Sequence, residues 1–337
     1  MNSTQHSADR RDRLEAHADR LAGGPDSPFH ALDVVVVGGG PAGLQAALTL
    51  GRVHRDVVLL DAGEGRNAPA AEMHNFITRD GTPPADFRRL AHAELAAYPT
   101  VVVRQARVSA VTDLPEPQQP GSSAFRITLD DGTELTARRV VLATGVRDQL
   151  PDIPGLRELW GDLVAHCPFC HGHEFAGRTV AVIGAGPAGH LPGLLAPVAG
   201  KVVVLTNGEE LTGALPVPGE VPVLTDRVVE VRRHGEGVRI TLGSSEMVEA
   251  AGVFVGTALR QTAPLADQLG LELNPSGCVR VDERGRTSRA GVYAAGDMAH
   301  VPALPMPMAS VAQAVAAGAL AAATVVADSL ADSLADR

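Results

Sequence analysis

The residues best suited to chemistry are gathered in one short stretch, "HCPFCHGHE" at positions 166–174. Two cysteines, Cys167 and Cys170, are separated by two residues, and histidines stand around them. A cysteine pair at this spacing beside a βαβ pattern is typical of a thiol–disulfide redox site. The stretch therefore predicts a site at which a disulfide is made or broken.

Two other interpretations of this stretch are open. A zinc ion could use the donors Cys167, Cys170, His171 and His173. All four lie within seven residues, however, and lack the well-separated second pair that is usual in structural zinc sites. The cysteines could also be buried structural residues, which is what we expect of the third cysteine, Cys278. We favour redox chemistry and expect no metal.

A disulfide-forming site also needs a proton acceptor, because the oxidation of a dithiol releases two protons. Histidine accepts protons near neutral pH, since its unperturbed pKa is about 6.5. His171 directly follows the second cysteine and His166 directly precedes the first, so both are candidate bases. His173 is expected to be structural.

A repeat indicates which elements position this stretch. The sequence "DVVVVGGGPAG" at 33–43 returns as "TVAVIGAGPAG" at 179–189. Each copy has a β-branched strand, a GxGxxG turn and a candidate helix, which together form the dinucleotide-binding unit. The N–H groups of the turn and the helix N-terminus suit a pyrophosphate. A single copy would be weak support, but two copies predict two nucleotide-binding folds.

The first copy is complete. Pro41 suits the first position of a helix, and "VVLLDAG" at 57–63 forms a second strand that ends in Asp61. Asp61 follows Gly38 by 23 residues, near the spacing of an acid that binds a ribose hydroxyl.

The second copy is incomplete. The same spacing from Gly184 gives Asn207, so no acid stands there for the ribose of NADH, and the nearby Glu209 would repel the 2′-phosphate of NADPH. Pro192 and Pro197 interrupt the helix that should come next, at a cost of roughly 3 kcal/mol each in a helix interior. We expect nicotinamide binding to be lost or severely weakened. The alternative is that Asn207 itself binds the ribose.

Composition limits the classes of function. The chain has 337 residues, which suffices for two domains, and its hydrophobic content of 45% suits a globular protein. The net charge of −10 argues against nucleic acid or an anionic membrane as partner. Three cysteines are too few for a secreted disulfide scaffold. The polar segment 1–28 has no apolar signal core, so we expect a mobile tail on a cytoplasmic protein.

The apolar segment 308–327 is long enough to span a membrane. It is mostly alanine and carries Gln313, so a helix packed under a cofactor is the favoured interpretation. The preceding "VPALPMPM" at 301–308 is either part of a substrate wall or a surface loop.

The order of these motifs resembles the low-molecular-weight thioredoxin reductases. The resemblance rests on the first GxGxxG, "ATGVRDQLPDIPG" at 143–155, the CxxC just before the second GxGxxG, and "GVYAAGDM" at 291–298. It runs from about residue 31 to 328 and implies an α/β flavoprotein with two Rossmann-type domains that forms a homodimer. The implied domains are a discontinuous FAD-binding domain at 29–149 and 260–330, and a nicotinamide-type domain at 150–259 that carries the cysteines.

The resemblance also implies the residues that bind FAD. Asp61 is expected at the adenosine ribose, Val108 at the adenine, and Asp297 at the ribityl or phosphate portion. Asn75, Gln313 and Ala314 are expected at the flavin end. The full implied set is Gly38, Gly40, Pro41, Ala42, Gly43, Asp61, Asn75, Val108, Thr144, Gly145, Asp297, Gln313 and Ala314.

Two departures from the thioredoxin reductase pattern change the predicted function. The family's basic motif after the second unit's strand is replaced here by Thr206, Asn207 and Gly208. His171 stands where the family usually has aspartate. The tract "CPFCHG" with "LTNG" downstream resembles the dithiol oxidases that close disulfides in microbial natural products of the gliotoxin, holomycin and romidepsin type. In that branch FAD is reoxidised by O2 and the nicotinamide site is vestigial.

This resemblance predicts an FAD-dependent oxidase that closes a disulfide in a small-molecule dithiol through a Cys167–Cys170 disulfide and gives H2O2. The alternatives are an NAD(P)H-dependent reductase of thioredoxin or a small disulfide, and a flavin-bound sensor without turnover.

Overall fold

The structure is a computed structural model of the 337-residue chain, and it describes residues 32–114, 124–217 and 220–335. The chain divides into two compact units. The first unit comprises the described residues up to Arg66, Ala85–Arg147 and the chain from Leu259 onward. The second unit comprises Asn67–Pro84 and Asp148–Ala258. The predicted mobile tail at 1–28 lies outside the described residues.

The division differs from the predicted domain boundaries mainly in one segment, and the boundaries predicted after residues 149 and 259 lie two residues and one residue earlier. The segment 67–84 was expected in the first domain, but it clusters with the second unit. The strands β7 (Val146–Gln149) and β16 (Ala258–Gln261), which pair with each other, contain the residues at which the chain passes between the units.

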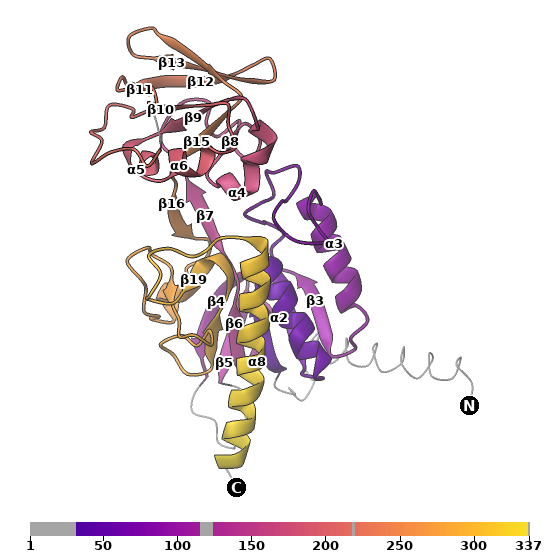
Figure 1. Cartoon of the computed structure of the whole chain (residues 1–337). Coiled ribbons are helices and arrows are strands. Elements are labelled where there is room, and N and C mark those ends of the chain that lie inside the picture. The colour runs from indigo at the N-terminus through magenta and orange to yellow at the C-terminus, as the bar shows by residue number, and fades with distance from the viewer. Residues whose placement is uncertain (1–31, 115–123, 218–219, 336–337) are drawn as a thin grey trace, which may run out of the picture. The chain divides into compact units, whose positions relative to one another are not determined.

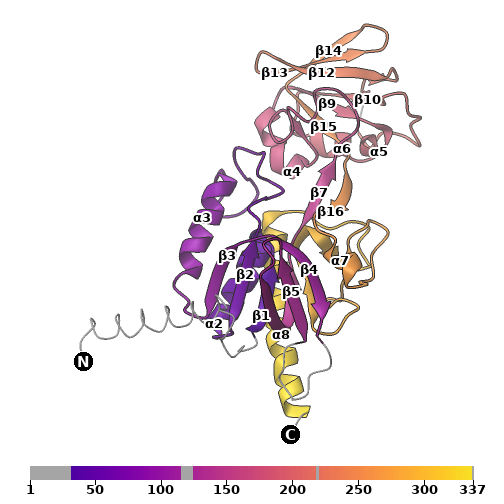
Figure 2. The same ribbon diagram turned by 180° about the vertical axis from the view of Figure 1, so that it is seen from behind.

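A seven-stranded sheet forms the centre of the first unit (Figure 2). Its order is β3-β2-β1-β6-β5-β4, and β18 also pairs with β6. The pairs β1–β2, β1–β6, β2–β3 and β6–β18 are parallel, whereas β4–β5 and β5–β6 are antiparallel. The strands are β1 Leu32–Val37, β2 Val57–Asp61, β3 Val101–Gln105, β4 Val108–Asp113, β5 Phe125–Leu129, β6 Glu134–Leu142 and β18 Val292–Ala294.

The strands β1 and β2 are nearly continuous runs of buried valine and leucine because both faces of this part of the sheet are covered. On one face lie α2 (Pro41–Arg52) and α8 (Val311–Ala335), side by side in Figures 1 and 2. A Cβ on Gly318 of α8 would lie 2.0 Å from the carbonyl oxygen of Ala42, so glycine lets the two helix backbones touch. The first unit also contains α3 Pro84–Leu95, α7 Leu265–Gln268, η2 Gly296–Met298, and the paired strands β17 Val279–Arg280 and β19 Ala299–His300.

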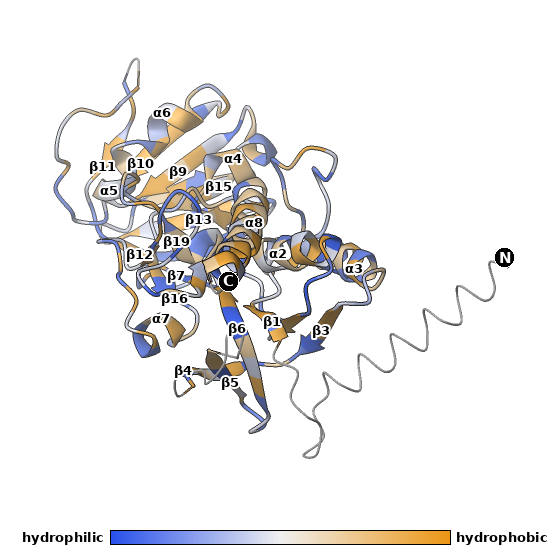
Figure 3. Ribbon diagram, turned by 90° about the horizontal axis from the view of Figure 1, so that it is seen from below, coloured by the Kyte–Doolittle hydropathy of each residue, from blue (hydrophilic) through white to orange (hydrophobic). Residues whose placement is uncertain are grey.

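Among the described residues, α8 is the one helix long and apolar enough to cross a membrane by length and composition alone. Its hydrophobic character is visible in Figure 3. Its buried residues include Ala314, Gly318 and Ala321, which belong to the core around α2. The helix is therefore packed on the nucleotide-binding fold, and its predicted position under a cofactor stays a prediction.

The second unit has a smaller parallel sheet of order β11-β10-β9-β15-β8. Its core is rich in fully buried valine, and Phe254 is the largest of its fully buried side chains. A three-stranded antiparallel sheet of β12, β13 and β14 adds to this core. The strands are β8 Val164–Ala165, β9 Thr179–Ile183, β10 Lys201–Leu205, β11 Val223–Leu224, β12 Val228–His234, β13 Gly237–Leu242, β14 Met247–Ala250 and β15 Gly252–Val255.

The helices of the second unit are short. They are α4 Pro168–His171, η1 His173–Phe175, α5 Ala185–Ala188 and α6 Leu191–Leu195. The predicted interruption of the helix after the second GxGxxG turn is confirmed. Helix α5 ends after four residues, and α6 begins anew with Pro192 in its first turn. The chain stops being helical again before Pro197. Proline is tolerated at the start of a helix but not within one, so two short pieces replace one long helix.

Candidate active site

The first glycine-rich turn joins β1 to α2 and is built by close backbone contacts. Gly38 has φ +115°, and a Cβ there would lie 2.2 Å from the carbonyl oxygen of Ala143. A Cβ on Gly43 would lie 1.9 Å from the carbonyl oxygen of Gly38. Side chains at either position would push the turn, the helix and β6 apart.

The open side of this turn suits a pyrophosphate. Gly40 is the N-cap of α2, Pro41 occupies the first turn as predicted, and no atom lies within 4 Å of where a Gly40 Cβ would be. Helix α2 is 12 residues long, so its N-terminus offers unpaired N–H groups and the positive end of a full helix dipole. This cradle fits the phosphates of FAD.

Asp61, at the end of β2, lies against the same turn. Its Cγ would be 2.1 Å from a Cβ on Gly39, and only 7% of the residue is exposed. The N–H of Gly63 donates to its Oδ1 at 2.8 Å, and Arg88 Nη2 is 3.4 Å from its Oδ2. The carboxylate is therefore held beside the turn, where the sequence predicts a ribose contact.

Other predicted FAD residues gather around the same end of the sheet. The backbone nitrogen of Thr144 would lie 2.9 Å from a Gly38 Cβ. A Cβ on Gly296 would lie 3.0 Å from the Cβ of Ala42 and 3.9 Å from that of Ala314. Thus α2, η2 and the start of α8 meet there.

Sequence reasoning missed the partner of Asp297. Arg66 Nη1 donates to Asp297 Oδ2 at 2.8 Å, and only 16% of the Arg66 side chain and 21% of the Asp297 side chain are exposed. The two residues are 231 positions apart, so no local pattern could have paired them.

The remaining predicted FAD residues are more scattered. Val108 is buried at the start of β4, and Gly145 has φ +70° just before β7. Gln313 is exposed in the first turn of α8, and its N–H is capped by Ser310 Oγ at 3.1 Å. Asn75 belongs to the second unit, with φ +60°.

The second glycine-rich turn, in the second unit, is occupied by the protein itself. Gly184 has φ +100° and precedes α5, whose four residues are too few to offer a helix N-terminus to an anion. The N–H of Ala185 donates to Glu209 Oε2 at 2.8 Å. The spacing of the first copy leads to position 207, which is not an acid. The carboxylate that contacts the turn belongs to a residue two positions further on.

The residues that replace the reductases' basic motif have other roles. Thr206 is fully buried. Asn207 has φ +58°, and its side-chain oxygen accepts the N–H of Val228 at 2.8 Å. Asn207 is thus used to connect β10 to β12, which weakens the alternative that it binds a ribose.

The cysteine pair lies on a single helical turn of the second unit. Cys167 is the N-cap of α4, and the N–H of Cys170 donates to its carbonyl oxygen at 3.1 Å. Positions three apart on a turn face the same side. A Cβ on Gly172 would lie 2.5 Å from the carbonyl oxygen of Pro168, so glycine allows the chain to fold tightly over α4. Both cysteines are half-buried thiols, and Phe169 between them is 67% exposed.

The histidines of this stretch differ in environment. Burial lowers the pKa of His171, partly offset by a hydrogen bond to the backbone of Gly161 and the charge of Glu174. The His166 ring stacks on Trp160, with centroids 5.6 Å apart. His173 is exposed in η1. Because burial disfavours its charged form, the His171 imidazole is suited to accept a proton while neutral, which fits the predicted base.

The surroundings of the three cysteines bear on the two alternative interpretations. Within the described residues, no group of three or more His, Cys, Asp or Glu side chains is arranged to hold a metal ion. Cys278 is fully buried just before β17, its Sγ lies 3.6 Å from the carbonyl oxygen of Asp297, and burial raises the pKa of its thiol. Of the three cysteines it is the one with the expected structural environment.

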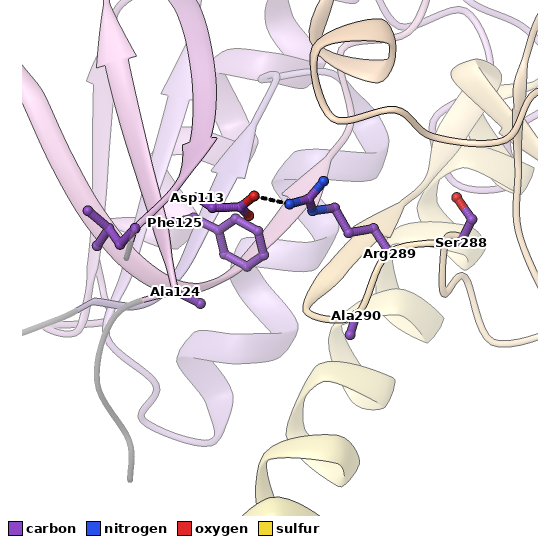
Figure 4. A pocket seen from close by; sticks show the side chains of 7 residues that line it. Asp113, Ala124, Phe125, Ser288, Arg289 and Ala290 are labelled. Carbon is purple, nitrogen blue, oxygen red and sulfur yellow. Dashed lines mark hydrogen bonds and ion pairs between the residues drawn. The ribbon is translucent and has the colours of Figure 1, made fainter. Parts of the chain in front are cut away.

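A surface hollow of about 450 Å³ in the first unit contains none of the predicted residues. Figure 4 shows Arg289 pointing toward Asp113, and the two form an ion pair. The segment at 301–308, with Met306 and Met308 exposed, forms an irregular loop after β19.

The two glycine-rich folds, with a dithiol directly before the second, define a flavoprotein oxidoreductase of the two-dinucleotide-fold type. The chain belongs to the pyridine nucleotide-disulphide oxidoreductase family, whose sequence model matches residues 32–319. FAD is the cofactor of these thioredoxin reductase-like proteins, and the first turn fits it.

Known proteins of fungi and bacteria are similar over most of the chain. The thioredoxin reductase tcpT of Claviceps purpurea is 31% identical, with 80% of this chain and 88% of that protein covered. The thioredoxin reductase aclD of Aspergillus oryzae is 33% identical, with 79% and 88% covered. The crystal structure of HlmI matches with a TM-score of 0.79 at 33% identity, covering 90% of this chain and 94% of that one. An oxidoreductase from Agrobacterium tumefaciens matches with a TM-score of 0.77 at 34% identity, covering 89% and 99%.

Proposed function

We propose that this protein is an FAD-dependent dithiol oxidase that closes a disulfide in a small-molecule dithiol, with O2 as the final acceptor and H2O2 as a product. The observation that carries the proposal is the state of the second nucleotide fold. Its helix is broken after four residues, and the N–H of Ala185 is already bonded to the carboxylate of Glu209. This N–H of the turn is therefore already used and does not face a phosphate.

The chemistry begins with the cysteine pair as a disulfide. A substrate thiolate attacks Cys167, which forms a mixed disulfide and releases the Cys170 thiolate. The second substrate thiolate then attacks the substrate sulfur of the mixed disulfide, so the product disulfide forms and the Cys167 thiolate leaves. FAD, when bound, supplies the two-electron acceptor that returns the cysteine pair to the disulfide, and O2 takes those electrons to give H2O2.

His171 is the proposed base. Its lowered pKa keeps the imidazole neutral at cellular pH, so it is ready to accept a thiol proton. A hydrogen bond to the Gly161 backbone and the charge of Glu174 partly offset this lowering. His166, stacked on Trp160, is proposed to line the site beside Cys167 and is the second candidate base.

One observation favours a second candidate, a nicotinamide-dependent disulfide reductase. Glu209 lies against the second turn much as Asp61 lies against the first, so it could hold the ribose hydroxyls of NADH. The names of tcpT and aclD, both thioredoxin reductases, agree with a reductase. Glu209 would reject the 2′-phosphate of NADPH by charge, so this candidate is specific for NADH.

Anaerobic mixing of the FAD-loaded protein separates the two candidates. An oxidase is bleached by dithiothreitol but not by NADH or NADPH, and it then releases H2O2 when air is admitted. Rapid bleaching of the flavin by NADH would refute the oxidase proposal. Cys170→Ser should abolish dithiol turnover while FAD stays bound, and Cys278→Ser is the matched control that should remain active.

The proposal includes the wider organisation that the sequence predicts. The proposed FAD-binding residues lie in the first unit apart from Asn75, and the proposed redox residues lie in the second unit. A homodimer in the cytoplasm is the expected form, and sedimentation of the purified protein tests the dimer.

A further inference from the structure

Two basic side chains of α3 reach the acid that the sequence predicts at the ribose of FAD. Arg88 and His92 are four residues apart, so they lie on one face of this 12-residue helix. Arg88 Nη2 is 3.4 Å from Oδ2 of Asp61, and His92 Nε2 is 3.7 Å from the same oxygen. The sequence predicted no cofactor contact from this helix, so both residues are additional to the predicted set.

Apolar packing holds α3 in place beside these contacts. Leu95 is buried in the core around α2, and Phe87 and Ala91 pack against that core. These three residues follow one another at intervals of four, so they form the buried face of the helix. Replacement of Arg88 or His92 should therefore leave α3 folded.

Arg88 also connects the two ends of the turn that follows β2. Its Nη1 donates to the carbonyl oxygen of Gly63 at 3.0 Å, and the N–H of Gly63 donates to Asp61 Oδ1 at 2.8 Å. The Oδ1 atom is thus used within this turn. A Cβ on Gly39 would overlap Asp61 Oδ2. The Oδ2 atom therefore lies between the first glycine-rich turn and the two basic side chains.

Two nitrogens on this face of α3 are buried without a partner. Arg88 Nε and His92 Nε2 are shielded from solvent, and neither has a hydrogen-bond partner among the residues that the structure describes. The 3.7 Å between His92 Nε2 and Asp61 Oδ2 is too long for a hydrogen bond. A buried polar atom without a partner is unfavourable and rare in folded proteins. The two nitrogens therefore point to a ligand beside Asp61.

We propose that Arg88 and His92 bind the adenosine ribose of FAD together with Asp61. Each ribose hydroxyl both donates and accepts hydrogen bonds, whereas an ionised carboxylate only accepts them. Arg88 Nε supplies a donor, and His92 Nε2 can donate or accept according to its tautomer. The three side chains thus match a diol better than Asp61 alone. This inference rests on the proposed ribose contact of Asp61, and it holds for an oxidase and a reductase alike.

Flavin fluorescence titrations of the FAD-free protein test these contacts. Arg88→Met and His92→Leu should each raise the Kd for FAD about 10-fold, since each variant loses about one hydrogen bond to the ligand. The Kd for FMN should stay as in the wild type, because FMN lacks the adenosine. Arg89→Met is the matched control on the same helix. The Arg89 side chain is 68% exposed, so this variant should bind both flavins as the wild type does.

Thermal melting separates ligand binding from a structural role. Without FAD, His92→Leu should melt no lower than the wild type, because it removes a buried nitrogen that lacks a partner. With FAD present, the rise in melting temperature should be smaller in this variant, since a ligand stabilises the folded state by an amount that grows with its affinity.

Wild-type Kd values for FAD in both Arg88→Met and His92→Leu would overturn the inference. An equal loss of FAD and FMN affinity, or a lower melting temperature of FAD-free His92→Leu, would also overturn it, since these residues would then be only structural. If Asp61→Asn binds FAD normally, the ribose lies elsewhere and the inference fails with that assignment. Flavin bleaching by NADH, in contrast, bears on the oxidase proposal alone.

Discussion

The two glycine-rich turns of this protein share one sequence pattern and differ in the helix that each one starts. After the first turn, α2 runs for 12 residues; after the second, α5 runs for four and the chain kinks at His190. Beside the first turn, the Asp61 carboxylate is held by the N–H of Gly63. Beside the second, the Glu209 carboxylate has taken an N–H of the turn itself.

Under the proposed function, the GxGxxG motif specifies a strand and a turn but does not by itself make a nucleotide-binding site. An anion site also needs a helix long enough to have a dipole and free N–H groups at its start. The prolines downstream of the second motif remove the first requirement, and Glu209 removes part of the second.

The third glycine of each motif provides the sharpest test of this difference. Gly43→Ala places a Cβ 1.9 Å from a backbone oxygen, whereas the matched Gly189→Ala places one at an ordinary φ and 3.3 Å from its nearest neighbour. Overpacking of this kind typically costs about 1–3 kcal/mol or more. Gly43→Ala should weaken FAD binding about 100-fold, measured by flavin fluorescence titration, and Gly189→Ala should leave it unchanged. An equal loss in the two variants would mean that the second turn also supports the cofactor.

The acids after the second strands provide the next test. Asp61→Asn should lower FAD affinity about 10-fold, since a hydrogen bond to a charged group is worth about 1.5–3 kcal/mol. Asn207→Asp at the equivalent position should not change it, because an aspartate can still accept the N–H of Val228. Calorimetric titration with FAD measures both. If Asp61→Asn binds FAD normally, the ribose contact is assigned to the wrong residue.

The Glu209 contact should have a smaller effect. Glu209→Ala removes the acceptor of the Ala185 N–H on the surface, so the melting temperature should fall by about 1–2 °C. Glu210→Ala, its exposed neighbour, should melt as the wild type does. Neither variant should gain flavin reduction by NADPH, because the helix remains broken. A gain in Glu209→Ala would show that the carboxylate alone closes the site.

The proposed role of His171, in the second unit, should appear in the pH dependence of turnover. Burial disfavours the charged form of His171, so its folded pKa lies below 6.5. The decrease in kcat/KM for dithiothreitol at acid pH should therefore have its midpoint below pH 6.5. His171→Asn should abolish this decrease. Because this pKa is lower in the folded state than in the unfolded state, His171 contributes stability above pH 6.5 that is lost as the pH falls toward the folded pKa. A midpoint above pH 6.5 would indicate that another group is the base.

Local patterns predicted the parts of the fold that depend on neighbours in sequence. The valine-rich strands, the turn at Gly38, the start of α2 at Pro41 and the broken helix at Pro192 all follow from propensity and backbone geometry. The alanine-rich C-terminal helix was predicted for the same reason.

Long-range contacts were beyond such patterns. The Arg66–Asp297 ion pair and the His74–Glu174 contact join residues that no spacing rule relates. The placement of 67–84 in the second unit depends on packing such as that of Gly161 on Pro69. The sequence predicted an effect of the Glu209 charge but not its contact with the second glycine-rich turn. The turn at Asn207 and Gly208, both with positive φ, redirects the chain just before it.

The contact between Gly318 and Ala42 also has a consequence for biosynthesis. The first turn and α2 leave the ribosome early, whereas α8 is among the last elements to emerge, on the order of tens of seconds later. Until then the nascent chain exposes the face of α2 that α8 covers. We therefore expect cofactor loading to be a late event, with chains that end before residue 311 released without flavin.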